Sequence, residues 1–208
     1  VYESLLELDP SDVEAQNVYA QILKSTGDED RAIEQQEISL QQDPENTRLM
    51  FSLGETYFRR GEYKNAVEKF QMYLEKKPTD TFAMEYLGNA QQNLGNFRDA
   101  ITTYEKLLGI DPDNAKILCE MATCYRELKQ FPTARRIARR ALAVYPNFGL
   151  AHIVIGETYE AAVDNCIASR EEQQTKFDDK LVNQLAYEEY RKALNDPRYA
   201  VSARRHMN

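Results

Sequence analysis

TRLMFSLGETYFRRGEYKNAVEKFQMYLEKKPTD, residues 47–80, contains two apolar periodicities that are separated by a glycine and ended by a proline. In its first part, small and apolar side chains follow the i, i+3, i+4, i+7 spacing of one helix face: Met50, Leu53, Gly54 and Tyr57. Gly61 predicts the end of this helix, because glycine adopts the left-handed conformation without steric cost. A second periodic segment follows, and Pro78 ends it because proline cannot continue a helix. The stretch therefore predicts a helix–turn–helix unit.

The same residue types return every 34 residues along the chain. A proline closes five successive units, at Pro10, Pro44, Pro78, Pro112 and Pro146. Small residues recur at one phase of the first helix, at Gly54, Gly88, Ala122 and Gly156, and at one phase of the second, at Ala32, Ala66, Ala100 and Ala134. A further series, Gly27, Gly61, Gly95 and then Lys129, marks the turn between the two helices. Because small side chains let helices approach closely, we expect Gly54 and Ala66 to mark the contact within their unit.

On these residues the chain resembles the tetratricopeptide repeat family. The family pattern is a large residue, leucine, glycine and tyrosine on the first helix, then glycine, an aromatic, alanine, an aromatic, a small residue and proline. Residues 47–80 carry it in Met50, Leu53, Gly54, Tyr57, Gly61, Tyr63, Ala66, Phe70 and Pro78, with Tyr73 in place of the usual small residue. The resemblance implies an all-α fold, an α-solenoid of tandem helix–turn–helix repeats in a right-handed superhelix.

We expect one solenoid domain whose limits follow the 34-residue phase. Its segments would be the second helix of a truncated repeat at 1–12, four repeats at 13–46, 47–80, 81–114 and 115–148, a fifth at 149–197, and a C-terminal helix at 198–208. The fifth repeat carries about 18 inserted residues, since the alanine expected near residue 168 corresponds better to Ala186. Residues 160–195 contain no glycine or proline, which predicts an extended helical hairpin that turns near 170–179. Its role stays open between a cap and a docking projection.

Composition and charge narrow the classes of partner. The net charge is −8, and residues 1–104 hold 10 basic and 19 acidic side chains, an excess expected to repel nucleic acid. No apolar run approaches the roughly 20 residues that a membrane helix needs, so we expect no membrane insertion. The first residue is Val1, and we expect the chain to be a fragment of a longer protein.

Residues suited to catalysis or metal binding are sparse. The two histidines are His152, at a core phase, and His206, and the three cysteines form no disulfide framework. Neither a phosphate-binding glycine loop nor a G-x-S-x-G turn occurs. We therefore predict no enzyme activity, no metal and no cofactor. Free thiols favour the cytoplasm, whereas a periplasmic or exported location stays an alternative.

The resemblance implies that the first helices line a concave groove, with the second, fifth, ninth and twelfth side chains of each repeat pointing into it. Relatives that bind acidic chaperone tails place lysine at a fifth position, but here those positions hold Asn17, Phe51, Glu85, Cys119 and Ile153, so that clamp is missing. Aromatic residues at the groove instead predict apolar anchor points for a peptide. The expected groove residues are Arg48, Phe51, Glu55, Phe58, Arg59, Phe82, Glu85, Tyr86, Asn89, Lys116 and Arg126. Packing of some aromatics between repeats stays an alternative.

The sequence thus predicts a non-catalytic scaffold that binds a peptide or protein segment in its groove. One alternative is a self-assembling module that forms homo-oligomers through the bare repeat edge at residues 1–12 or near Leu150 and Ile153. Another is a regulatory or recruiting domain of a larger enzyme or assembly complex. The basic cluster RRIARR, residues 135–140, is interpreted either as a solvated face or as a contact for an acidic partner or phosphate.

Overall fold

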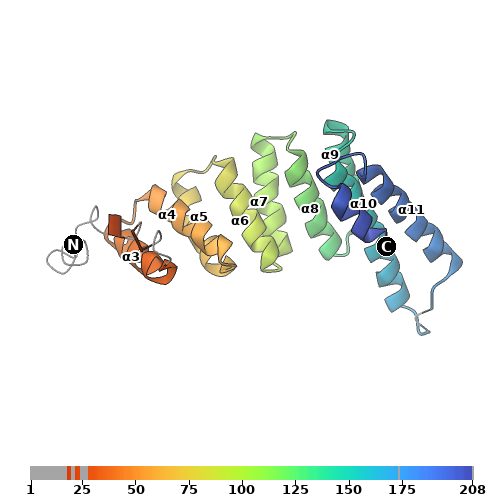
Figure 1. Cartoon of the computed structure of the whole chain (residues 1–208), viewed down its shortest axis with the longest axis horizontal. Coiled ribbons are helices and arrows are strands. Elements are labelled where there is room, and N and C mark those ends of the chain that lie inside the picture. The colour runs from red at the N-terminus through yellow and green to blue at the C-terminus, as the bar shows by residue number, and fades with distance from the viewer. Residues whose placement is uncertain (1–17, 20–21, 24–27, 173, 208) are drawn as a thin grey trace. The chain divides into compact units, whose positions relative to one another are not determined.

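The computed structural model describes residues 18–19, 22–23, 28–172 and 174–207, which contain helices and no strand (Figure 1). The expected all-α fold is confirmed for these residues. The labelled helices are α3 (Glu29–Gln42), α4 (Thr47–Arg59), α5 (Tyr63–Lys76), α6 (Thr81–Asn93), α7 (Phe97–Ile110), α8 (Ala115–Glu127), α9 (Phe131–Val144), α10 (Gly149–Ala168), α11 (Phe177–Ala193) and α12 (Ala200–His206). The helix expected at residues 1–12, together with Gly27, lies outside the described part of the chain.

The chain divides into two compact units, Val1–Leu94 and Gly95–Asn208. In the first unit each helix from α3 to α6 contacts the next, and α4 also contacts α6. In the second unit each helix from α7 to α12 contacts the next, and α8 also contacts α10. Contacts between neighbours and next neighbours are the pattern of stacked helix pairs. The repeat limits, the single domain and the handed superhelix stay predictions.

The glycine series lies at the turns between helices. Gly61 and Gly95 have φ angles of 76° and 78°, in the left-handed region that glycine adopts without steric cost. Lys129 follows α8 at the same phase with a φ of 59°, and it is the one non-glycine residue with a positive φ in the described ranges. The helix starts are held by side chains, since Asn46 and Asn114 each accept a hydrogen bond from a backbone N–H three residues ahead, at 3.1 Å.

The first unit is held together by a close approach of α4 and α5. A Cβ atom on Gly54 would lie 2.9 Å from ring carbons of Phe70, and Phe70 and Ala66 are fully buried. The glycine therefore lets the ring fill the space between the helices, as its phase predicted. The acid Glu37 of α3 adds a polar link, because it accepts hydrogen bonds from the Tyr57 hydroxyl and the Lys69 ammonium, both at 2.8 Å.

The second unit repeats the glycine contact in a longer helix pair, α10 and α11. A Cβ atom on Gly156 would lie 2.6 Å from the ring of Tyr190, and Ala186 is buried beside it. The helices have 20 and 17 residues, where α8 and α9 have 13 and 14. Their turn is closed by an ion pair between Arg170 and Asp179, and that guanidinium, with the Lys176 backbone N–H, lowers the pKa of Asp179 to about 2.

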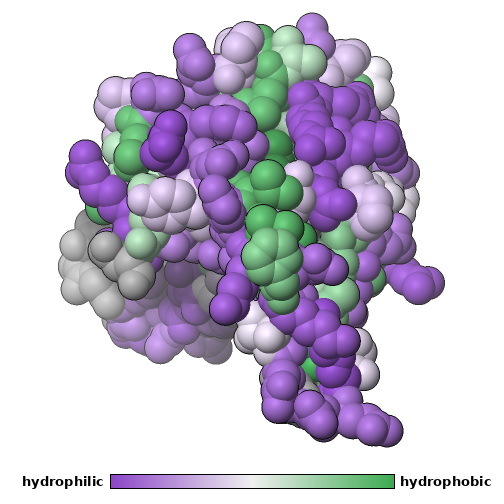
Figure 2. Space-filling model, turned by 90° about the vertical axis from the view of Figure 1, so that its right-hand side faces the viewer, coloured by the Kyte–Doolittle hydropathy of each residue, from purple (hydrophilic) through white to green (hydrophobic). Residues whose placement is uncertain are grey.

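The exposed side of α11 is partly apolar. Large apolar side chains on it reach solvent at Phe177, Leu181, Leu185 and Tyr187. Figure 2 views the side on which α11 lies in Figure 1, and it shows hydrophobic residues gathered in a stripe between hydrophilic ones. Phe177 is 73% exposed, the same exposed fraction as Phe82 in the first unit.

Candidate functional site

An aromatic cluster joins α4, α5 and α6 in the first unit. Its members are Phe51, Phe58, Tyr63, Phe70, Tyr73 and Tyr86. The ring centre of Tyr86 lies 5.1 Å from that of Phe70, 5.4 Å from that of Phe58 and 6.0 Å from that of Phe51. Such ring pairs contribute about 0.5–1.5 kcal/mol each beyond their buried area. Phe51, Phe58 and Tyr86 are half-buried, so these expected groove residues also hold the three helices together.

A hydrogen bond links Tyr86 of the cluster, on α6, to Glu55 on α4. The Tyr86 hydroxyl donates to Oε1 of Glu55 at 3.0 Å, across from α6 to α4. Burial, and then the Glu55 carboxylate, raise the pKa of Tyr86, so the hydroxyl keeps its proton and remains a donor. Glu55 was expected to face the groove. The structure brings it together with Phe51, Phe58 and Tyr86.

Phe82 differs from the rest of the aromatic patch, because its ring is 73% exposed. It lies in the first turn of α6, four residues before Tyr86, so the two residues share one side of the helix. Asp80 caps this turn by accepting hydrogen bonds from the backbone N–H groups of Phe82, at 3.0 Å, and Ala83, at 3.1 Å. Tyr73 of the cluster in turn donates to Asp80 at 2.7 Å. The backbone that carries the exposed ring is therefore fixed.

The charged residues expected around the patch have different surroundings. Arg48 is exposed on the first turn of α4, and Glu85 and Asn89 are half-buried on α6. Arg59 forms an ion pair with Glu29 of α3 at 3.7 Å, which points it toward the preceding helix. The Arg59 charge also acts on the Tyr86 hydroxyl of α6, where it opposes the rise in the pKa, so Arg59 lies near the aromatic cluster as well.

Lys116 and Arg126 belong to the second unit, and one groove that contains all the expected residues stays a prediction. Arg126 of α8 forms an ion pair with Glu157 of α10 and another with Glu127, at 3.0 Å. His206 of α12 also approaches Glu157, at 3.4 Å. Glu157, the counterpart of Glu55 in the repeated pentapeptide, therefore links neighbouring helices as Glu55 does.

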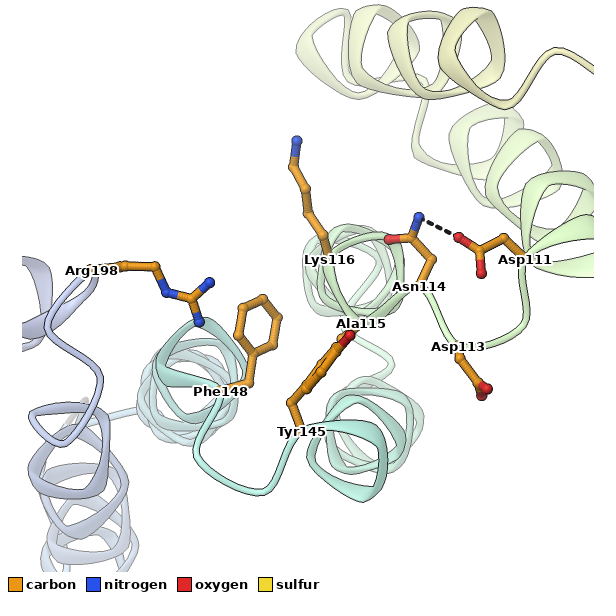
Figure 3. Close-up of a pocket in the computed structure, with 8 residues that line it drawn as sticks. All are labelled: Asp111, Asp113, Asn114, Ala115, Lys116, Tyr145, Phe148 and Arg198. Carbon is orange, nitrogen blue, oxygen red and sulfur yellow. Dashed lines mark hydrogen bonds between the residues drawn. The ribbon is translucent and has the colours of Figure 1, made fainter.

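A cavity of about 550 Å³ opens beside Lys116 (Figure 3). It is lined by Asp111, Asp113, Asn114, Ala115, Lys116, Tyr145, Phe148 and Arg198. Figure 3 shows the Arg198 guanidinium beside the Phe148 ring on one side of the cavity, and the α7–α8 turn with Asn114 on the other. The guanidinium carbon lies 5.6 Å from the centre of that ring. Tyr145, Phe148 and Arg198 were not predicted as site residues, because they lie outside the helices and their periodic positions.

Asp196 fixes Arg198 and the last turn. Its carboxylate accepts two hydrogen bonds from the Arg198 guanidinium, at 2.9 and 2.8 Å, and one from the backbone N–H of Gly149 at 3.1 Å. The guanidinium first, and the backbone N–H groups next, lower the pKa of this buried carboxyl to about 2. Arg198 is therefore already paired, and the cavity beside it carries no uncompensated charge from this residue.

A smaller cavity of about 230 Å³ brings together several expected groove positions of the second unit. Cys119 and Thr123 of α8 meet Leu150, Ile153 and Glu157 of α10 there, and Tyr199 and Ser202 complete its wall. Burial raises the pKa of the Cys119 thiol, which keeps it protonated and a poor nucleophile. Across residues 28–172 and 174–207 no group of three histidine, cysteine or acidic side chains is arranged to hold a metal ion. None of the described helices is long and apolar enough to span a membrane.

Comparison with known proteins identifies the repeat. Two family models described as tetratricopeptide repeat match residues 26–81 and 94–155. No curated protein matches the sequence.

Solved structures share the fold. A crystal structure of MamA protein is 20% identical over 91% of this chain and 94% of its own, with a TM-score of 0.69. YrrB, described as a TPR protein with an unusual peptide-binding site, is 17% identical over 99% of this chain and 98% of its own, with a TM-score of 0.63. The C-terminal part of a TPR repeat-containing protein from Cytophaga hutchinsonii is 17% identical over 92% of this chain and 72% of its own, with a TM-score of 0.62. These likenesses show the fold, a helical solenoid.

Proposed function

Because the chain belongs to the tetratricopeptide repeat family, we propose that it is a non-catalytic scaffold that binds a peptide or protein segment against α4 and α6. A protein-interaction role is what the fold and the similar structures support, and YrrB is described as having a peptide-binding site. The observation that carries the finer proposal is the exposed ring of Phe82 beside the half-buried aromatic cluster. The bound segment would contribute an apolar side chain that covers this ring.

The physical argument rests on the area and the rigidity of this surface. Covering an exposed phenylalanine side chain completely contributes about 1.5–3 kcal/mol, and buried aromatic residues carry much of the energy of interfaces. The Asp80 cap and the Tyr86–Glu55 hydrogen bond fix the backbone around the ring, so little ordering is left for the binding step. Arg48, Glu85 and Asn89 would form a polar rim.

Lys116 and Arg126 belong to the second unit, and we propose separate roles for them there. Lys116 is exposed at the start of α8, where it is a candidate contact for an acidic group. Arg126 is half-buried and paired with Glu157, so we assign it the role of holding α8 and α10 together.

The test is affinity capture from a lysate of the native organism, followed by mass spectrometry. The informative change is Phe82→Ser alone, because Phe51 and Phe58 pack in the cluster and their loss would weaken the fold. Phe177→Ser is the matched control, since that ring is also 73% exposed but lies in the second unit. We expect the wild type and Phe177→Ser to capture the same partner protein, and Phe82→Ser to lose it. The helicity of both variants should be unchanged. Equal retention by all three would refute the site on α4 and α6.

A further inference from the structure

Four arginines on α9 form a second charged surface, in the second unit. This arginine face consists of Arg135, Arg136, Arg139 and Arg140. The helix contains no aspartate or glutamate, and within the described part of the chain none of the four forms an ion pair with a carboxylate. Since the whole chain carries a net charge of −8, this concentration of unneutralised positive charge is opposite in sign to the rest of the protein.

Two of these arginines are oriented by a tyrosine of the helix pair that follows. The guanidinium carbon of Arg135 lies 4.8 Å from the ring centre of Tyr159, and Nη2 of Arg139 donates to the Tyr159 hydroxyl at 3.3 Å. A phenol ring attracts and positions a guanidinium without cancelling its charge. The two side chains are therefore partly ordered before any partner binds.

The other two arginines line a cavity of about 400 Å³ at α7, α8 and α9. Arg136 and Arg140 line it together with Glu105, and its apolar lining comes from Leu108, Met121, Tyr125 and Ile137. Gly109 also lines the cavity, and a Cβ atom there would meet nothing within 4 Å. The cavity wall thus combines apolar side chains with two guanidinium groups.

We propose that the arginine face binds an acidic peptide segment that places one apolar side chain in this cavity. Guanidinium groups bind carboxylates through paired hydrogen bonds, and such charge-assisted bonds are stronger than neutral ones. The carboxylates on either side of the apolar residue would contact Arg136 and Arg140. This surface lies on α7 and α9, so it is separate from the site proposed on α4 and α6, and the two proposals can fail independently.

The surroundings favour a peptide over other anions. A nucleic-acid backbone offers no aliphatic side chain for the cavity. An anionic membrane surface would need exposed large apolar side chains beside the charges, and α9 exposes none. A short acidic peptide with a single leucine satisfies both the charge and the apolar side chains of the cavity wall.

Fluorescence anisotropy of the full chain with a labelled EEELEEE peptide tests the proposal. We expect Arg136→Glu/Arg140→Glu to bind about tenfold more weakly or worse, because each loses charge-assisted hydrogen bonds. Arg204→Glu/Arg205→Glu makes the same charge change on exposed arginines of α12, and it should bind within about twofold of wild type. EEEGEEE, which lacks the apolar side chain, should bind several-fold more weakly than EEELEEE.

Three results would overturn the assignment. Equal weakening by both arginine pairs would show general charge attraction, and equal affinity for the two peptides would remove the cavity from the site. Tighter binding of a single-stranded oligonucleotide or of phosphatidylserine-containing vesicles would make the face a phosphate contact. If the charge-reversed variant loses helicity, Arg136→Gln/Arg140→Gln takes its place with the same expected order of affinities.

Discussion

The pentapeptides GETYF, residues 54–58, and GETYE, residues 156–160, place the same backbone contact in two different surroundings. Gly54 faces the Phe70 ring and Gly156 faces the Tyr190 ring. In both, the threonine hydroxyl donates to the carbonyl four residues earlier, at 2.9 Å from Thr56 and 2.6 Å from Thr158. The shared glycine therefore allows the same close approach of the two helices in both pairs.

The fifth residue of the pentapeptide is Phe58 in the first unit and Glu160 in the second. The ring that faces the glycine also differs, being Phe70 in the first unit and Tyr190 in the second. In the first unit Phe58 and Phe70 both contact Tyr86, which makes the surroundings apolar. In the second, Glu160 accepts a hydrogen bond from the Tyr190 hydroxyl at 2.6 Å, and burial followed by this carboxylate raises the pKa of Tyr190. One helix pair thus has an aromatic side and the other a polar one, which is why the peptide site is proposed on α4 and α6.

The inserted residues do not disturb the contact. The ring follows the glycine by 16 residues in the first unit and by 34 in the second, a difference of 18. The additional residues lie in the far ends of α10 and α11 and their turn. A helix pair can therefore be lengthened at its open end while its close approach is kept.

Adding a methyl group at either of these two glycines should have the largest effect on stability. Gly156→Ala should destabilise the protein by about 2–3 kcal/mol and Gly54→Ala by somewhat less, because the new atom overlaps a buried ring. Gly109→Ala is the control: it adds the same atom in a helix where nothing lies within 4 Å, so it should stabilise by up to about 1 kcal/mol. Urea unfolding followed by circular dichroism measures all three. Equal effects at the three sites would refute the close approach.

Exchanging the polar pair Glu160 and Tyr190 for two phenylalanines tests whether these two positions are coupled. Tyr190→Phe should cost about 1–2 kcal/mol, because it removes the hydrogen bond to the Glu160 carboxylate. Glu160→Phe should also destabilise, whereas the double variant, which copies the Phe58 and Phe70 pair, should cost less than the sum of the two. A double-mutant cycle from the same unfolding measurements gives this coupling. Strictly additive changes in the free energy of unfolding would mean that the side chains at positions 160 and 190 do not interact.

The smallest effect is expected at the turn where the units differ in residue type. Gly61 and Lys129 both have positive φ, and only lysine is strained there. Lys129→Gly should stabilise by about 0.5 kcal/mol, since relief of this strain slightly exceeds the added freedom of the unfolded chain. Gly61→Ala should have the opposite sign. A lower unfolding midpoint for Lys129→Gly would contradict this explanation.

The periodicity of the sequence predicted those structural features that depend on a single helix pair. The small residue at Gly54 and the left-handed turn at Gly61 are local demands that one helix pair satisfies by itself. The links between pairs were not predicted: Glu55 to Tyr86 and Arg126 to Glu157 each span 31 residues and depend on how the next pair stacks. Phase alone also did not separate the packed ring of Phe51 from the exposed ring of Phe82, because both occupy positions that were expected to face the groove. The cavity at Arg198 is lined mainly by turn residues, and their types change between repeats: Asp111 and Asn114 lie in one turn and Tyr145 and Phe148 at the same phase in the next.

Hydrogen–deuterium exchange of the full chain, with and without a segment of the captured partner, tests the peptide site most directly. The proposal predicts slower exchange in α4 and in the first turns of α6 around Phe82, and no slowing there in Phe82→Ser. Slower exchange confined to α9 or α11, with α4 and α6 unchanged, would contradict it.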